Sequence, residues 1–185
     1  MQLVCMAAFL AGCAGPRRTP VEVDPATLSD DAFLHYLADV PVVTVDEAYR
    51  AMLILADGED TTKSFEEREA KLIERGVARR AWGLKRENVI DHGSVAAMVA
   101  KVLRLKGGVN RLIFGSMGLG DRRYATRELI YRDMLPEGPD YTAMRGGVMV
   151  ALVSKADTYM QEHGIYESEK IELGEEEEAR RLGGE

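Results

Sequence analysis

The sequence predicts an all-α domain in which about six helices are arranged as three pairs, with only short extended segments between them. Apolar residues recur at intervals of three and four in several stretches, which is the spacing of a helix that buries one face. Residues typical of helix starts and stops bound these stretches. The most strand-like run, residues 112–114, is too short for more than an extended contact. These observations favour a helical domain over residues 28–162.

The first two predicted helices have well-marked boundaries. Ser29 is a candidate N-cap for a helix that ends where Val40 precedes Pro41, because the residue before a proline disfavours helical geometry. The second helix opens with Thr44-Val45-Asp46-Glu47, a capping box in which the threonine and glutamate side chains each accept a backbone N–H bond. We expect this helix to end at Gly58.

The next two helices are marked in the same way. Ser64-Phe65-Glu66-Glu67 is a second capping box, and Gly76 is a candidate C-terminal cap for the helix that it opens. Asp91 can cap a fourth helix with a long apolar stripe, which Gly107-Gly108 would close.

The last two helices follow a glycine-rich stretch, residues 115–120, which we interpret as a flexible connector. A fifth helix is predicted from about residue 121 or 124 to residue 133, where a segment with two prolines breaks the chain. A sixth runs from near Arg145 to about Glu162. Residues 163–185 are acidic, and we expect them to be frayed or disordered.

Composition limits the classes of function. The net charge of −7 argues against a nucleic-acid partner, because such proteins usually present a basic patch. The three histidines, His35, His92 and His163, are scattered without the close pairing of metal ligands, so we expect no metal and no other cofactor. We also expect a monomer.

Two local patterns bear on catalysis. The glycines of residues 115–120 lack the Gly-x-Gly-x-x-Gly spacing of a dinucleotide loop, although the neighbouring Arg122 and Arg123 can form a surface anion site. His92 and Ser94 lie two residues apart at a predicted helix start, where side chains do not face each other, so N-cap chemistry explains them better than a catalytic pair. We find no catalytic constellation in the sequence.

A basic loop is the most prominent candidate binding surface. It carries four cations around the only tryptophan, at Arg79, Arg80, Trp82, Lys85 and Arg86. Cations beside an aromatic ring can bind an acidic polymer, a sugar ring or lipid headgroups. The alternative is that Trp82 packs inward and holds a solvated loop in place.

The N-terminal stretch Leu10-Ala11-Gly12-Cys13 resembles the processing site of bacterial lipoproteins, although no Lys or Arg precedes its apolar run. The resemblance implies a signal peptide over residues 1–12, cleavage between Gly12 and Cys13, acylation of Cys13 and a flexible tether over residues 13–27. Membrane lipid would hold the protein through the acyl chains. Ala14 implies sorting to the periplasmic face of the outer membrane in a Gram-negative cell.

The helix pairs show a weak internal repeat. The second helix of each pair is expected to begin near Thr44, Asp91 and Ala143, at intervals of roughly 47 and 52 residues, which is the size of a two-helix repeat. This layout resembles the S-layer homology domain, a three-fold helical bundle that binds cell-wall polysaccharide or peptidoglycan. The arginine that this family uses for binding is missing from the first two units, Thr44-Val45-Asp46-Glu47 and Asp91-His92-Gly93-Ser94.

These inferences favour a lipid-anchored envelope protein whose domain binds or scaffolds without catalysis, with cell-wall polymer as the candidate ligand. Two alternatives stay open. One is an envelope hydrolase or accessory enzyme whose site forms only in three dimensions. The other is a soluble intracellular helical protein whose start is wrongly assigned.

Overall fold

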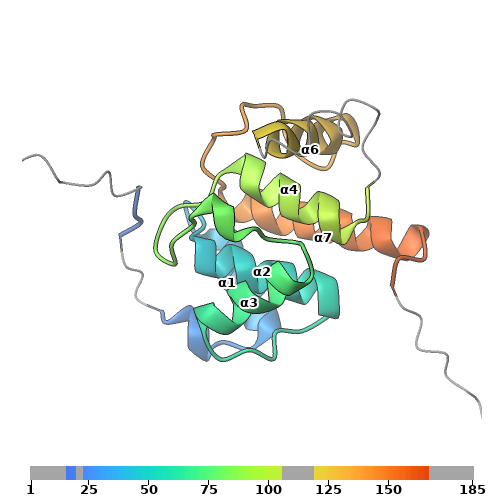
Figure 1. Ribbon diagram of the computed structural model, residues 1–185. Helices are drawn as coiled ribbons and strands as arrows, with labels where there is room; N and C mark the ends of the chain where they lie inside the picture. The colour runs from blue at the N-terminus through green and yellow to red at the C-terminus, as the bar shows by residue number, and fades with distance from the viewer. Residues whose placement is uncertain (1–15, 20–22, 106–118, 167–185) are drawn as a thin grey trace, which may run out of the picture.

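The computed structural model describes residues 16–19, 23–105 and 119–166. Within these ranges the chain forms six α-helices and two short 3-10 turns and contains no β-strand, so the all-α prediction is confirmed. The helices are α1 (Asp30–Asp39), α2 (Val45–Asp57), α3 (Phe65–Glu74), α4 (His92–Val102), α6 (Leu119–Tyr131) and α7 (Gly146–Glu162), and the turns are η1 (Pro25–Thr27) and η2 (Arg80–Trp82) (Figure 1).

Local capping determines where most of the helices begin. Ser29 caps α1 by accepting a hydrogen bond from the backbone of Ala32, and Asp91 caps α4 in the same way from Ser94 at 2.6 Å. Both halves of the capping box at the start of α2 are present, since Thr44 and Glu47 each accept a backbone bond from the other. These three predicted starts are confirmed.

The capping box predicted for α3 forms only in part. The Ser64 hydroxyl accepts the backbone N–H of Glu67 at 3.2 Å, but the Glu67 carboxylate accepts from the backbone of Lys63, one residue before the expected donor. Gly76 follows the end of α3 with a φ of +68°, a conformation that glycine adopts without steric cost, as its predicted capping role requires.

Some predicted boundaries are wrong. Helix α4 ends at Val102, well before the predicted stop at Gly107-Gly108, which lies outside the described residues. Helix α6 already begins at Leu119 and includes Gly120, which was predicted to belong to a flexible connector. Residues 112–118, with the predicted extended contact and the rest of that connector, also lie outside the description, as does the acidic tail from residue 167.

The helices pack cyclically. The three pairs are α1 with α2, α3 with α4 and α6 with α7. The second helices of the pairs meet at the centre, where α2 contacts both α4 and α7. Each first helix packs against the second helix of a different pair, so that α1 lies on α7, α3 on α2 and α6 on α4 (Figure 1). No pair can therefore bury its apolar faces alone, and the fold closes on itself after three pairs.

Backbone hydrogen bonds at the centre repeat this cyclic order. Val43 donates to Met144 at 2.8 Å, Met144 donates to Ile90 at 2.8 Å, and Ile90 donates back to Val43 at 3.0 Å. All three residues are buried, and each lies directly before the N-cap of a central helix. Three chain segments are thus joined by one closed ring of bonds, which satisfies their buried amides without a β-sheet.

This ring corrects the register predicted for the third pair. The third central helix is capped at Arg145, whereas the repeat had been placed at Ala143. Aligning the three N-caps gives intervals of about 47 and 54 residues. With this register the apolar residue Met144 takes part in the ring of hydrogen bonds, and the polar turn that precedes it does not.

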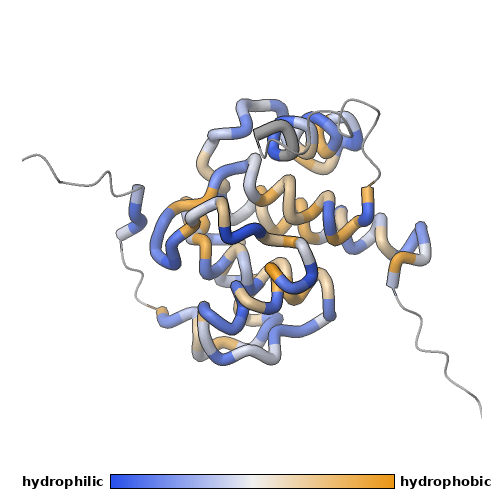
Figure 2. Tube along the Cα trace, viewed as in Figure 1, coloured by the Kyte–Doolittle hydropathy of each residue, from blue (hydrophilic) through white to orange (hydrophobic). Residues whose placement is uncertain are grey.

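The core lies along the central helices. Ten of the eleven residues of α4 are buried. Figure 2 shows that α4 is mostly apolar, whereas α3 and α6 carry many hydrophilic residues. Helix α7 approaches α1 closely because Gly146 has no side chain, and its backbone N–H donates to the carbonyl of Val40 at 3.2 Å.

The predicted flexible tether is wrong for part of residues 13–27. Residues 16–19 lie against the domain, since the Pro16 carbonyl accepts the backbone N–H of Val89 at 2.9 Å and Arg17 forms an antiparallel bridge with Asn88. The Pro25 carbonyl accepts a bond from the guanidinium of Arg50 at 2.6 Å. Residues 16–19 and Pro25 are held by contacts with distant parts of the chain, which the local composition does not predict.

Candidate functional site

The basic loop divides into two parts with different partners. Its first part winds into η2, and Gly83 ends the turn with a φ of +59°. Trp82 is half-buried and packs against the core, while Arg80 and Lys85 are exposed and Arg79 is half-buried. The expected inward packing of Trp82 is therefore present, and it leaves one face of the indole for another contact.

That contact comes from α6. The guanidinium carbon of Arg122 lies 4.9 Å from the centre of the Trp82 ring, within the range of a cation–π interaction. Arg122 also lies 3.8 Å from the carboxylate of Asp91, the N-cap of α4. The structure thus joins Trp82 to an arginine that sequence reasoning placed in a separate anion site.

The second part of the loop belongs to another group of charges. Arg86 donates to Asp46 at 3.1 Å, and Asp46 accepts a further bond from Arg68 at 2.8 Å. Arg86 is still 53% exposed. The five predicted binding residues therefore do not form one cluster, because Arg86 faces α2 and Trp82 faces α6.

A hollow beside α6 is the candidate site for an anionic ligand, because it presents two exposed arginines. Its volume is about 350 Å³, and it lies between α6 and the turn that leads to α7. Its lining residues are Arg123, Thr126, Arg127, Ile130, Gly138, Pro139, Asp140 and Tyr141. Arg123 and Arg127 are exposed, one helical turn apart, and within the described part of the chain neither forms an ion pair. The ring of Tyr141 is 80% exposed at the edge.

A larger hollow of about 730 Å³ lies at the C-terminal ends of α2, α4 and α7. Most polar side chains at this hollow bind other side chains of the protein. Asp57 forms ion pairs with Lys71 and Arg75, and Tyr166 donates a hydrogen bond to Asp157. Burial would raise the pKa of Asp57, but these two cations hold it below its ordinary value. Apart from the paired Arg75, the exposed cation that lines this hollow is Arg104. The larger hollow therefore presents fewer cations to an anionic ligand than the α6 hollow does.

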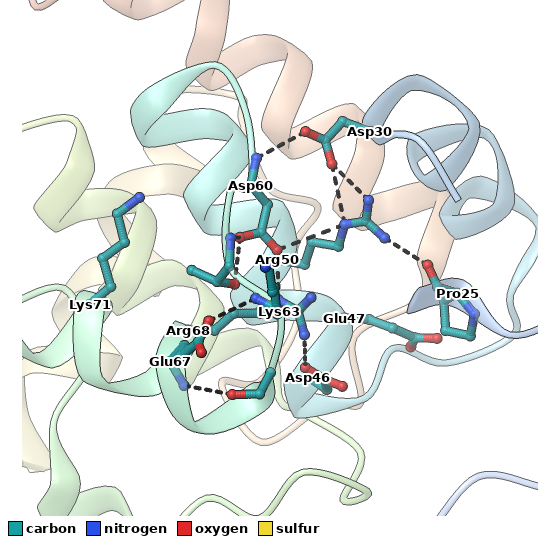
Figure 3. A network of polar contacts seen from close by, with 12 residues as sticks. Pro25, Asp30, Asp46, Glu47, Arg50, Asp60, Lys63, Glu67, Arg68 and Lys71 are labelled. Carbon is teal, nitrogen blue, oxygen red and sulfur yellow. Dashed lines mark hydrogen bonds and ion pairs between the residues drawn. The ribbon is translucent and has the colours of Figure 1, made fainter. Parts of the chain in front are cut away.

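Two arginines of the first two helix pairs, Arg50 and Arg68, are held in a buried charge cluster (Figure 3). Asp60, whose side chain is only 1% exposed, accepts from Arg68 at 2.6 Å and from both the backbone and the hydroxyl of Thr62. Arg50 spans Asp30 and the carbonyl oxygens of Pro25 and Leu28, as Figure 3 shows in part. Burial would raise the pKa of Asp60, but these donors lower it below its usual value.

A second buried ion pair holds the N-terminal segment. The two terminal guanidinium nitrogens of Arg18 donate to Glu47, Nη2 at 2.5 Å and Nη1 at 2.9 Å. Arg18 also donates to the Val42 carbonyl and to the Tyr36 hydroxyl. Burial alone would lower the pKa of Arg18, but the bonds and charge of Glu47 raise it above its ordinary value. Burial, together with Glu47, raises the pKa of Tyr36 to about 12. Sequence reasoning missed this site, because Glu47 was assigned only to its capping box.

His92 and Ser94 do not form a nucleophile–base pair. Both are buried, and among the residues that the structure describes neither His92 Nδ1 nor Ser94 Oγ has a hydrogen-bond partner. The backbone amides of this turn are used instead, since His92 and Gly93 donate to the carbonyls of Thr142 and Asp140. Burial, opposed by the charge of Asp91, lowers the pKa of His92.

The described residues place two further limits on the chemistry. No group of three or more potential metal ligands gathers within the described ranges. None of the described helices has both the length and the apolarity needed to cross a bilayer. Gly12 and Cys13, the predicted cleavage and acylation residues, lie outside the described ranges.

Comparisons with known proteins do not assign the chain to a family. No protein-family model matches the chain, and searches of curated proteins and of solved structures find no significant match.

Proposed function

We propose that the protein is a lipid-anchored envelope protein, held in the membrane through acylated Cys13, whose helical domain is a non-catalytic binding module for an anionic envelope polymer such as a cell-wall polysaccharide. The observation that carries the binding proposal is the α6 hollow with Arg123 and Arg127, which form no ion pair within the described ranges. The proposal of an anchor rests on the sequence Leu10-Ala11-Gly12-Cys13, which resembles the processing site of bacterial lipoproteins.

The charge distribution supports an anionic ligand. The chain has a net charge of −7, and its buried arginines each bind a carboxylate. Arg123 and Arg127 differ, because they face a hollow and lack such a partner among the described residues. Guanidinium groups bind carboxylates and phosphates through two parallel hydrogen bonds. Carboxylates and phosphates occur along many polysaccharides and teichoic-type polymers.

The geometry also suits an extended ligand. The hollow is open, and the exposed ring of Tyr141 and the ring of Pro139 supply flat apolar surface beside the arginines. Arg122, also on α6, contacts Trp82 of η2, the turn that carries the exposed Arg80. A polymer could therefore contact the α6 hollow and the first part of the basic loop together, whereas a compact ligand would use only one of them.

The cyclic packing of three helix pairs is consistent with the proposed likeness to S-layer homology domains. In the third unit the N-cap of α7 is the exposed residue Arg145, whereas Thr44 and Asp91 occupy the equivalent positions of the first two units. If the relationship holds, only one of the three units retains an arginine near this position. Three equivalent sites are therefore not expected, and binding is assigned instead to the α6 hollow, which Arg123 and Arg127 line.

The anchor is tested by expressing the natural chain beside a Cys13→Ser variant and comparing intact mass and membrane fractionation. We expect the natural chain to lose its first twelve residues, gain acyl mass and enter the membrane fraction, and the variant to do none of these. Full-length soluble protein in both cases would refute the anchor and favour an intracellular protein with a wrongly assigned start.

The ligand is tested by co-sedimentation with purified cell-wall sacculi. An Arg123→Gln/Arg127→Gln variant should lose most of its binding, and added salt should weaken binding of the natural protein because exposed charges are screened. The control, Arg132→Gln/Lys155→Gln, removes two exposed charges outside the hollow and should bind normally. Equal binding by both variants would overturn the proposed site, and release of soluble wall fragments would favour the alternative of a hydrolase.

A further inference from the structure

The N-terminal segment, residues 16–19, is fixed to one edge of the domain. Its backbone pairs with residues 85–89: Val89 donates to the Pro16 carbonyl, and Arg17 lies in an antiparallel bridge with Asn88. We name these two stretches, residues 16–19 and 85–89, the docking edge. The segment is drawn beside the loop before α4 in Figure 1, on the opposite side of the molecule from the C-terminal end of α7.

The attachment depends on a buried side chain as well as on backbone bonds. The side chain of Arg18 is 9% exposed, and that of its partner Glu47 is 3% exposed. Releasing the segment would leave the Glu47 carboxylate buried without its cation, although Thr44 and Tyr36 would still donate to it. The cost of an unpaired buried charge therefore opposes undocking.

Covalent geometry then limits where the acyl chains can lie. Cys13 precedes Pro16 by three residues, and an extended chain spans at most about 3.6 Å per residue. The Cα atom of Cys13 thus lies within about 11 Å of Pro16, whatever path the intervening residues take. If Cys13 is acylated, its acyl chains must therefore enter the membrane close to the edge of the domain to which residues 16–19 are fixed.

We propose that the docking edge faces the lipid surface, so that the domain is held in one orientation on the membrane and Arg17 and Lys85 contact anionic headgroups. This inference rests on the proposed acylation of Cys13. Both cations are exposed, and Arg86 beside them is partly exposed, whereas Glu87 is the exposed acid of this edge. The α6 hollow uses none of these residues and stays available to a polymer.

The orientation is tested by fluorescence quenching in vesicles. After signal cleavage and acylation the mature chain would keep no free thiol, so one introduced cysteine takes the label. Glu87→Cys places the label on the docking edge, and Glu162→Cys places it at the end of α7; both replace an exposed glutamate. The acylated proteins are reconstituted in vesicles of phosphatidylethanolamine and phosphatidylglycerol that carry a quencher on the lipid headgroup.

We expect quenching at residue 87 to be several-fold stronger than at residue 162. Inserting about 20 Gly and Ser residues between Ala14 and Gly15 adds a flexible span of roughly 25 Å and should bring the two labels toward equal quenching. Equal quenching in acylated, membrane-bound protein without the insertion would overturn the orientation and leave the anchor intact. Absence of acyl mass and of membrane association would instead refute the anchor, and the orientation with it.

Discussion

Gly146 is a position where this fold should not tolerate even one added carbon atom. A Cβ atom on this residue would lie 1.9 Å from the carbonyl oxygen of Leu37 and 2.7 Å from that of Val40. Non-bonded heavy atoms pack best at about 3.5–4.0 Å, so α1 and α7 would have to separate by more than roughly 1 Å. Neither clashing atom can rotate away, because both belong to the backbone of α1 and the turn after it.

The expected cost follows from this separation. Overpacking of a close-packed interior costs about 1–3 kcal/mol and occasionally more. Separation would also lengthen the bond from the Gly146 amide to the Val40 carbonyl, worth about 1 kcal/mol. Alanine favours a helix over glycine by at most about 1 kcal/mol, which offsets part of this loss. We expect Gly146→Ala to lower the free energy of unfolding by about 3 kcal/mol.

The neighbouring glycine supplies the control. A Cβ atom on Gly147 would lie 3.6 Å from the carbonyl oxygen of Ala38, an ordinary contact, so Gly147→Ala should be neutral or stabilising by up to about 1 kcal/mol. The assay is urea unfolding followed by far-UV circular dichroism, with both changes made in the Cys13→Ser chain. If Gly146→Ala unfolds within about 0.5 kcal/mol of Gly147→Ala, the close approach of α1 and α7 is refuted.

Three further predictions concern charge and pH. Asp60→Asn should cost about 2 kcal/mol at neutral pH, because Arg68 loses its buried partner Asp60 but keeps Asp46. The pKa of Asp60 is depressed in the folded state, so its contribution to stability is present above the ordinary value of 3.8 and is lost as the pH falls through the folded value. Urea unfolding of Asp60→Asn should therefore depend less on pH in that acid range. His92 also has a depressed pKa in the folded state, so its neutral form favours folding and stability should fall as the pH drops below about 6.5, a loss that urea titrations of His92→Asn should not show. Arg122→Gln should shift the emission of Trp82, the single tryptophan, to longer wavelength with unchanged circular dichroism, and an unshifted spectrum would contradict the contact between these two residues.

Local signals predicted the helices well because each depends on neighbouring residues. The capping residues Ser29, Thr44 and Asp91 bond to amides three residues away, a distance at which sequence spacing determines geometry. The same kind of reasoning failed at α6, where glycine in the first turn was taken to exclude a helix. Tertiary packing of α6 on α4 overrides that weak preference.

Long-range pairing could not be predicted in this way. Arg18 and Glu47 are 29 residues apart, and the composition around Arg18 is typical of a linker. The ring formed by Val43, Ile90 and Met144 joins three segments that share only an apolar residue before an N-cap. The repeat indicated three similar units, but an error of two residues in the third unit was enough to hide the ring.

The division of the cations between buried pairs and two open surfaces explains how an acidic protein could bind anions at all. Net charge describes the whole chain, whereas a ligand responds to charges within about 8–10 Å at physiological salt. The buried arginines are neutralised by Glu47, Asp30 and Asp60 and contribute little at that range. If the α6 hollow and the docking edge act separately, Arg123→Gln/Arg127→Gln should remove most of the polymer binding without changing the ratio of quenching at residues 87 and 162. A change in that ratio would mean that the same surface serves both ligands, and the two proposals would have to be reduced to one.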